Sequence, residues 1–326
     1  MSLTPATVIG VDLGGTNLRA ALVDRNGKIL DAERVPTPPS RGAEVVGEIA
    51  ALVRRLAGSR GVLGVGIGSP GLVDQAMGRI VVSANFPEWR DVPLGGEVGR
   101  AVGLPVFLEN DANAAALGES WVGAGSSFRH FVLYTLGTGV GGGIVLDGDV
   151  WRGADGAAGE VGHVMVDPEG PVCGCGSRGC LEMFASATAI VRMAREALEG
   201  GADSAYLPAD ESGWSRLAAR DVWLAAREGD AVARSVFHRV GRSLGIAAAG
   251  VISLLNPQAI LIGGGAAEAW DFFIEDMMKE MKRRTYSWLA ERTHVLPAGL
   301  GADAGLLGAA RAAWLGVGRA GDASRR

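Results

Sequence analysis

Three cysteines and one histidine stand close together between residues 160 and 182, and their types are those that bind a metal ion. Cys173, Cys175 and Cys180 are the only cysteines of the 326-residue chain, and His163 is one of four histidines. Three thiolates and an imidazole complete a tetrahedral zinc site without an open position, which is typical of a structural metal. Buried core thiols are the alternative, but these cysteines lie among glycine, serine and arginine. We therefore predict a structural Zn²⁺ site.

The same stretch also carries carboxylates that could bind a polyol. Glu160 precedes the histidine by three positions, and Glu182 follows the last cysteine by two. A metal ion that folds this loop would fix the direction of both carboxylates and of His163. We expect the metal to position these three side chains and not to take part in chemistry itself.

Two loops rich in glycine and threonine follow apolar runs that have the composition of buried strands. Residues 12–16 are Asp-Leu-Gly-Gly-Thr, and residues 137–143 are Gly-Thr-Gly-Val-Gly-Gly-Gly. Turn amides without obstructing side chains form a concavity that binds phosphate. A carboxylate beside a phosphate calls for a divalent cation between them, so Asp12 indicates Mg²⁺ held through water. An ordinary hairpin turn is the alternative for each loop taken alone.

Other nucleotide-binding patterns fit poorly. The pattern G-x-G-x-x-G occurs at residues 66–71 and 137–142, each time after a strand, but neither copy opens a helix as a dinucleotide site requires. The sequence has no G-x-x-x-x-G-K-[ST] motif, which argues against a P-loop.

A carboxylate suited to proton transfer lies where a strand meets a helix. Glu109, Asn110 and Asp111 end a short apolar run and precede an alanine-rich segment. An ionised aspartate at a helix start can accept the proton of an attacking hydroxyl during phosphoryl transfer. A helix N-cap is an equally good interpretation of Asp111 from the sequence.

The elements that must position these residues alternate between strands and helices, which predicts an α/β fold. We expect strands at 7–11, 18–23, 29–35, 62–67, 106–108, 131–136, 140–146 and 259–262. We expect helices at 43–56, 112–121, 187–198, 231–255, 272–282 and 303–314, and a surface loop at 203–216. The order of strand, Gly/Thr loop, strand and turn occurs twice, which predicts two related halves with a cleft between them.

The composition indicates a globular protein and argues against nucleic-acid-binding and membrane-spanning proteins. Hydrophobic residues make up 48% and charged residues 21%, as in an ordinary globular protein, and the net charge of -5 argues against a nucleic-acid partner. Three cysteines fit a reducing compartment better than a disulfide framework. The N-terminus lacks a signal-peptide pattern, and the longest apolar run, 244–255, is too short to span a bilayer. We expect a cytoplasmic protein without a membrane partner.

The motifs together resemble those of the ROK family of sugar kinases and sugar-responsive repressors, most closely its bacterial glucokinase branch. Residues 173–182 match the family's C-x-C-G-x-x-G-C-x-E signature in full, with His163 in the position of the fourth ligand. The Gly/Thr loops look like its two phosphate motifs. The resemblance, from Val8 to about Leu315, implies a two-domain actin-like ATPase (ribonuclease H-like) fold. It implies a small domain of residues 1–112 plus 303–318, and a large domain of 113–302 that carries the zinc loop.

The resemblance also implies roles for individual residues. Asp111 would be the general base. The sugar-binding residues would be Gly71, Asn85, Asn110, Asp111, Glu160, His163 and Glu182. The nucleotide-binding residues would be Asp12, Gly14, Gly15, Thr16, Thr138, Gly139, Gly264 and Gly265. The zinc ligands would be His163, Cys173, Cys175 and Cys180. If His163 binds zinc through one nitrogen and the sugar through the other, the metal fixes its tautomer.

The implied function is ATP-dependent phosphorylation of glucose at its 6-hydroxyl, with Mg²⁺ as a cofactor, as a step of glycolysis and carbohydrate metabolism in a homodimer or homotetramer. A kinase for N-acetylmannosamine, N-acetylglucosamine or mannose is the alternative within enzymes, and polyphosphate is the alternative donor. A sugar-sensing repressor is the alternative of another class. It would need a helix-turn-helix before the first strand, which we expect to begin by Thr7.

Overall fold

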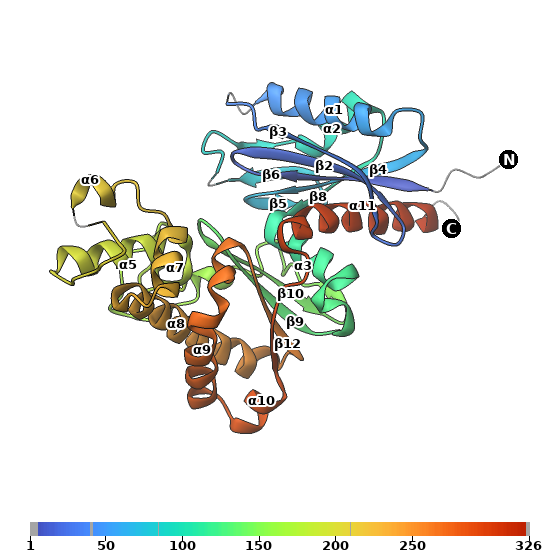
Figure 1. The fold of residues 1–326 in the computed structure, drawn as a ribbon. Helices are drawn as coiled ribbons and strands as arrows, with labels where there is room; N and C mark the ends of the chain where they lie inside the picture. The colour runs from blue at the N-terminus through green and yellow to red at the C-terminus, as the bar shows by residue number, and fades with distance from the viewer. Residues whose placement is uncertain (1–5, 40–41, 84, 209, 324–326) are drawn as a thin grey trace. The chain divides into compact units, whose positions relative to one another are not determined.

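The computed structural model describes residues 6–39, 42–83, 85–208 and 210–323, and Figure 1 shows its ribbon. The chain forms two compact units. The first unit comprises Met1–Arg129, Gly143–Gly159 and Ala298–Arg326, and the second comprises His130–Gly142 and Glu160–Pro297. The domain limits given above stay a prediction. In the described part of the chain, no helix combines the length and the apolar character needed to cross a bilayer.

The first unit is built on a five-stranded sheet with the order β3-β2-β1-β4-β8. Strand β1 pairs with β2 in antiparallel fashion and with β4 in parallel fashion. These strands are β1 (Thr7–Leu13), β2 (Asn17–Asp24), β3 (Ile29–Pro36), β4 (Val62–Ser69) and β8 (Val106–Asn110). A second sheet of three short strands consists of β5 (Leu72–Asp74), β6 (Arg79–Val82) and β7 (Arg90–Val92). The helices are α1 (Ala43–Ala57), α2 (Leu94–Val102), α3 (Asp111–Val122), η1 (Ala124–Ser127), η4 (Gly301–Asp303) and α11 (Ala304–Ala323).

Helices cover both faces of the main sheet of this unit (Figure 1). Successive side chains of a strand point to opposite faces, so β1 serves two cores. Ile9 and Val11 are fully buried in a cluster with residues of α1 and α2. Val8, which precedes Ile9 and points to the opposite face, is buried in a second cluster with residues of α11. Because both faces are covered, β1 is a nearly continuous apolar run and not an alternating one.

The second sheet has the order β11-β10-β9-β12-β13, and β12 is parallel to both β9 and β13. Its strands are β9 (Phe131–Leu136), β10 (Val140–Leu146), β11 (Asp149–Val150), β12 (Ala259–Gly263) and β13 (His294–Pro297). In each five-stranded sheet, the central strand (β1 or β9) comes first in the sequence. The next two strands along the chain lie on one side of it, and the later strands lie on the other side. This repeated order confirms the two related halves expected from the sequence.

The helices of the second unit come mostly after the cysteine-rich stretch. They are η2 (Val161–His163), α4 (Glu182–Ala185), α5 (Ala187–Glu199), α6 (Glu211–Trp214), α7 (Ala219–Arg227), α8 (Ala231–Leu255), η3 (Gly265–Ala269), α9 (Trp270–Arg284) and α10 (Ser287–Arg292). Helix α9 packs closely on α8. A Cβ atom at Gly241 would lie 2.2 Å from the carbonyl oxygen of Phe273, and one at Gly245 would lie 2.5 Å from that of Met277. The small residues of α8 therefore permit this close packing.

Candidate active site and metal cluster

The four predicted metal ligands lie together. The ligand atoms of His163, Cys173, Cys175 and Cys180 are all within 4.8 Å of one another. Sγ of Cys175 is 3.7 Å from Sγ of Cys180, and Sγ of Cys173 is 3.6 Å from Nδ1 of His163. Tetrahedral zinc with Zn–S bonds of about 2.3 Å separates its ligand atoms by about 3.6–3.8 Å. The donor set and its spacing therefore fit a zinc ion.

The loop that carries the cysteines is closed by its own backbone. The amide of Cys173 donates to the carbonyl of Ser177 at 2.8 Å, and the amide of Gly176 donates to the carbonyl of Cys173 at 3.0 Å. Isolated bridges join Met165 to Cys180 and Val172 to Arg178. The backbone N–H of Ser177 lowers the pKa of Cys175, whereas burial raises the pKa of Cys180 to about 12.

His163 is oriented with its two ring nitrogens toward different groups. Nδ1 faces Cys173, while Nε2 is 3.9 Å from Oε2 of Glu160. Glu160 is mostly exposed, with 64% of its side chain accessible. One nitrogen of the ring is thus directed to the metal cluster and the other to an exposed carboxylate.

Glu182, the first residue of α4, lies between the metal cluster and the second Gly/Thr loop. Its Oε1 is 3.9 Å from Sγ of Cys173, and its Oε2 accepts from the amide of Val140 at 3.0 Å. The second unit thus brings together the predicted residues Glu160, His163 and Glu182 with the loop of Thr138 and Gly139.

The glycine loops of the second unit follow parallel neighbouring strands. Gly263 of β12 is in register with Thr135 of β9, so the loops after both strands begin at one edge of the sheet. Gly264 lies against the carbonyl of Leu136, where a Cβ atom would come within 2.4 Å of that oxygen. Ligands of open α/β sheets bind at the carboxyl ends of parallel strands. Gly264, Gly265 and Thr138 therefore lie where a nucleotide would be expected.

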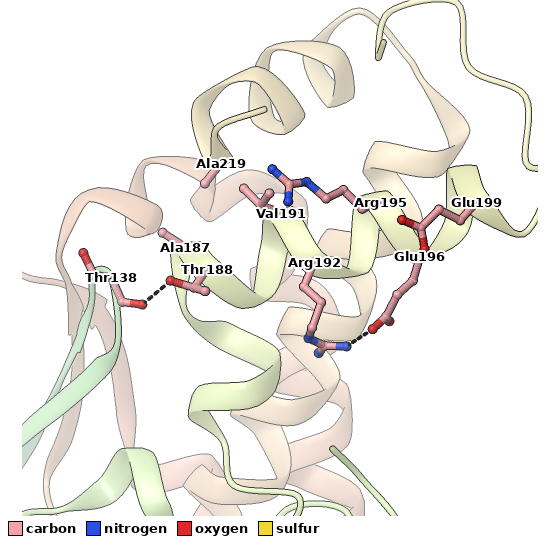
Figure 2. A pocket seen from close by; sticks show the side chains of 9 residues that line it. All are labelled: Thr138, Ala187, Thr188, Val191, Arg192, Arg195, Glu196, Glu199 and Ala219. Atoms are coloured by element: carbon pink, nitrogen blue, oxygen red, sulfur yellow. Dashed lines mark hydrogen bonds and ion pairs between the residues drawn. The ribbon is translucent and has the colours of Figure 1, made fainter. Parts of the chain in front are cut away.

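A pocket of about 700 Å³ opens beside Thr138 (Figure 2). It is lined mainly by one side of α5, including Thr188, Arg192 and Arg195. Nε of both arginines is buried and lacks a hydrogen-bond partner in the described residues. The pocket thus adjoins a predicted phosphate loop.

In the first unit, Asn110 and not Asp111 is the N-cap of α3. The side-chain oxygen of Asn110 accepts from the amides of Ala112 and Asn113, both at 3.0 Å. Its side-chain nitrogen donates to the carbonyl of Gly71 and to Oδ1 of Asp111, both at 3.1 Å. Asn110 thus joins two predicted sugar-binding residues, and the cap interpretation of Asp111 is wrong.

Asp111 is the first residue of α3, and it is accessible to solvent although surrounding protein atoms crowd its carboxylate. Its Oδ1 accepts from the amide of Ala112 at 2.9 Å. Desolvation by the surrounding protein raises the pKa of Asp111, and hydrogen bonds from the backbone amides of Ala112 and Asp111 and from the Asn110 side chain oppose the shift. A carboxylate with a raised pKa, exposed at a helix N-terminus, can exchange a proton with a bound hydroxyl.

The first Gly/Thr loop surrounds a second perturbed carboxylate. Burial raises the pKa of Asp12 to about 6, Arg19 lowers it, and Asp111 raises it further. Asp12, Gly14, Gly15 and Thr16 line a cavity of about 660 Å³ together with residues of β2 and β3. Asn85 lies beside this loop, since a Cβ atom at Gly15 would come within 3.2 Å of its Nδ2. A buried carboxylate with a raised pKa in a phosphate-type loop fits a divalent cation.

Glu109 and Arg152 form a buried ion pair that the sequence analysis missed. Oε2 of Glu109 accepts from Nε and Nη2 of Arg152 at 3.0 and 2.7 Å and from Nε2 of Gln75 at 2.6 Å. The Glu109 side chain is only 2% exposed. Its Oε1 accepts from the amide of Asn110 at 3.1 Å. The pair therefore holds the end of β8, where the Asn110–Asp111 sequence begins.

Comparison with known proteins agrees with these observations. A model of the ROK family matches residues 8–315. The chain belongs to this family. Over 304 residues it is 42% identical to the glucokinase of Thermotoga maritima, which covers 93% of this chain and 96% of that protein. It is also 29% identical over 306 residues to the xylose repressor of Bacillus subtilis, covering 92% and 75% of the two chains.

Solved structures of ROK proteins show the same fold. The chain superposes on a ROK family glucokinase from Streptomyces griseus, solved in complex with glucose and AMPPNP, with a TM-score of 0.81 and 39% identity. The match covers 95% of this chain and 99% of that chain. The ROK hexokinase of Thermus thermophilus gives a TM-score of 0.80 at 34% identity. The chain therefore has the α/β fold of the actin-like ATPases, as the resemblance predicted.

Proposed function

We propose that this ROK protein is an ATP-dependent kinase that phosphorylates glucose at its 6-hydroxyl. The observation that carries the proposal is the junction of β8 and α3. Asn110 caps the helix and binds Gly71, which leaves Asp111 exposed at the helix N-terminus with a raised pKa. The similarity to the Thermotoga maritima glucokinase and to the glucose-bound Streptomyces griseus structure supports a glucokinase over other reactions of phosphate.

Asp111 would act as the general base. Its Oδ1 is held by the Ala112 amide and the Asn110 side chain, so Oδ2 would accept the proton of the sugar 6-hydroxyl. The oxygen that loses this proton then attacks the γ-phosphorus of ATP, and ADP leaves. Positioning of the two reactants supplies most of the rate enhancement in such a transfer.

The remaining sugar hydroxyls would be bound by the polar groups that the family resemblance implies. These are Gly71, Asn85, Asn110, Glu160, His163 and Glu182. Carboxylates accept hydrogen bonds from hydroxyl groups, while amide side chains both donate and accept, so this set suits a polyol.

The nucleotide would be held by the glycine loops. Asp12, Gly14, Gly15, Thr16, Thr138 and Gly139 would contact the phosphates, with Mg²⁺ near Asp12 supplying the charge that the phosphates require. Gly264 and Gly265 would lie beside the adenosine. The pocket in Figure 2 would receive part of the nucleoside, because it opens beside Thr138 of the second Gly/Thr loop.

The zinc ion would have a structural role. His163, Cys173, Cys175 and Cys180 would occupy all four positions, which leaves none for a substrate. Nδ1 of His163 would bind the ion, since it faces Cys173 at 3.6 Å. The ring would then present Nε2 to the sugar in a fixed tautomer.

The test is an assay of ADP release from ATP with glucose, mannose, fructose, N-acetylmannosamine and N-acetylglucosamine, repeated with polyphosphate as donor. We expect the highest kcat/KM with glucose and ATP. A higher value with another sugar would assign the alternative substrate, and no phosphorylation of any sugar would favour a sugar-binding regulator.

Asp111→Asn tests the proposed base. The variant keeps the shape of the side chain but cannot accept the proton at neutral pH, so kcat should fall by about 10²–10⁴-fold while glucose still binds. Glucose binding is measured by calorimetry in the absence of ATP. Near-normal kcat in this variant would exclude Asp111 as the base.

A further inference from the structure

The second Gly/Thr loop is attached to the segment that carries the metal ligands. Glu182 approaches Cys173 with one carboxylate oxygen, at 3.9 Å, and accepts from the Val140 amide with the other, at 3.0 Å. We infer that Glu182 is a positioning residue for the phosphate loop of residues 137–143, so that the metal cluster sets nucleotide affinity as well as sugar affinity. The inference rests on the proposed function, because it assumes that this loop binds the phosphates of ATP.

Three further contacts tie the same loop to the metal-bearing segment or to the helix that follows it. The amide of Ala187 donates to the carbonyl of Gly137 at 2.8 Å. Oγ1 of Thr188 donates to the carbonyl of Thr138 at 2.8 Å, the bond drawn beside the pocket in Figure 2. A Cβ atom at Gly162 would lie 2.0 Å from the carbonyl of Val140. The conformation of the loop therefore depends on residues 162–188.

Gly139 shows how closely Glu182 approaches the loop. A Cβ atom at this position would lie 2.4 Å from Oε2 of Glu182, closer than any non-bonded contact allows. The carboxylate thus occupies the space that a side chain would take. Its bond to the Val140 amide is charge-assisted, and such bonds are stronger than those between neutral groups.

The position of the carboxylate has a consequence for phosphate binding. A nest of backbone amides binds an anion only when the amides converge on one point. The Val140 amide is already bound by Glu182, and the Gly137 amide donates to the Gly139 carbonyl at 2.9 Å, so both bonds fix the turn on which the phosphates would lie. Loss of the Glu182 bond should let the loop relax and weaken nucleotide binding even when no sugar is present.

Two substitutions separate this role from sugar binding. Glu182→Ala removes both contacts, so the affinity for Mg·ADP without sugar should fall about tenfold or more, since it loses a hydrogen bond to a charged group. Glu182→Gln keeps an oxygen that can accept from Val140, so it should retain most of the Mg·ADP affinity while glucose affinity falls. Glu169→Gln is the matched control, because Glu169 is an exposed carboxylate of the metal-bearing segment with no place in the proposed sugar or phosphate sites. Its Mg·ADP affinity should equal that of the wild type.

The measurement is isothermal titration of the full-length protein with Mg·ADP, with zinc content measured on every sample. Removal of zinc from the wild type should also weaken Mg·ADP binding without sugar. Equal Mg·ADP affinities for wild type and zinc-loaded Glu182→Ala would overturn the inference. If Glu182→Ala does not fold, Glu182→Asp replaces it, because the shorter side chain withdraws from Val140. An unchanged Mg·ADP affinity of Glu182→Asp would also overturn the inference. A wild type that binds no Mg·ADP would instead refute the proposed function.

Discussion

Asp12 offers a sharp test because its carboxylate makes opposite contributions to stability and to binding. Burial raises its pKa from 3.8 to about 6, Arg19 opposes this rise, and repulsion by Asp111 adds a smaller contribution to it. The folded state therefore holds the proton more tightly than the unfolded chain does. As the pH rises between 3.8 and about 6, the free energy of unfolding must fall, and above that range it levels off.

The magnitude follows from the difference in pKa. A difference of about two units corresponds to at most about 3 kcal/mol at pH 8, and integration of the linkage gives about 1 kcal/mol at pH 4.5. Asp12→Asn removes the charge without changing the shape. Measured in urea without Mg²⁺, the variant should exceed the wild type in free energy of unfolding by about 1 kcal/mol at pH 4.5 and about 3 kcal/mol at pH 8.

The matched control is Asp203→Asn, which changes an exposed carboxylate of the second unit and should leave the free energy of unfolding within about 0.5 kcal/mol of the wild type at both pH values. At pH 8, Asp12→Asn should also bind Mg·ATP more weakly, since the cation loses its carboxylate. The difference in free energy of unfolding between Asp12→Asn and the wild type should grow as the pH rises. A difference that is independent of pH, or that shrinks as the pH rises, would refute the reasoning from burial.

Two other substitutions follow from the contacts. Arg152→Met leaves the buried Glu109 charge without its bidentate partner, so the free energy of unfolding should fall by about 3–5 kcal/mol, and kcat should also fall. Arg152→Lys keeps the positive charge, so its free energy of unfolding, measured by chemical denaturation, should fall less. Cys175→Ser replaces an exposed thiol, so it should not open a cavity in the core. It should reduce zinc affinity by well over tenfold and weaken glucose binding. Intact glucose affinity in the zinc-free protein would contradict the positioning role of the metal.

Local patterns in the sequence were sufficient for the metal cluster and for the long elements. Three cysteines within eight residues must lie close together in space. The predicted helix 231–255 has the same bounds as α8. The three-stranded sheet at 72–92 was missed because strands of three or four residues have no measurable periodicity. Helix α2 was missed because glycines at positions 95, 96 and 99 lower its propensity, and its packing on α1 and β8 overrides that preference. Residues 203–216, expected as loop, contain the short helix α6.

The residues of the candidate site were predictable only where they form a motif within one short segment of the sequence. Asn110 and Asp111 are both good cap residues, and the sequence alone could not say which of them caps α3. The partner of Glu109 lies 43 residues away, at a position with no motif of its own, and that of Glu182 lies 42 residues away, in the second Gly/Thr loop. Such pairs depend on tertiary contacts, so they become visible only once the strands are placed.

The two Gly/Thr loops look alike in sequence but are held in different ways, and the difference bears on regulation of the site. The loop at residues 12–16 is fixed by β2 and by the segment that follows β3. The Gly14 amide donates to the carbonyl of Asn17, and Oγ1 of Thr37 donates to the Gly14 carbonyl at 2.7 Å. The loop at 137–143 instead depends on Glu182 and on Thr188, beyond the cysteines. If zinc orders residues 162–188, then its loss should disturb the second loop and spare the first. A duplicated phosphate motif would thereby respond to the metal in one copy only.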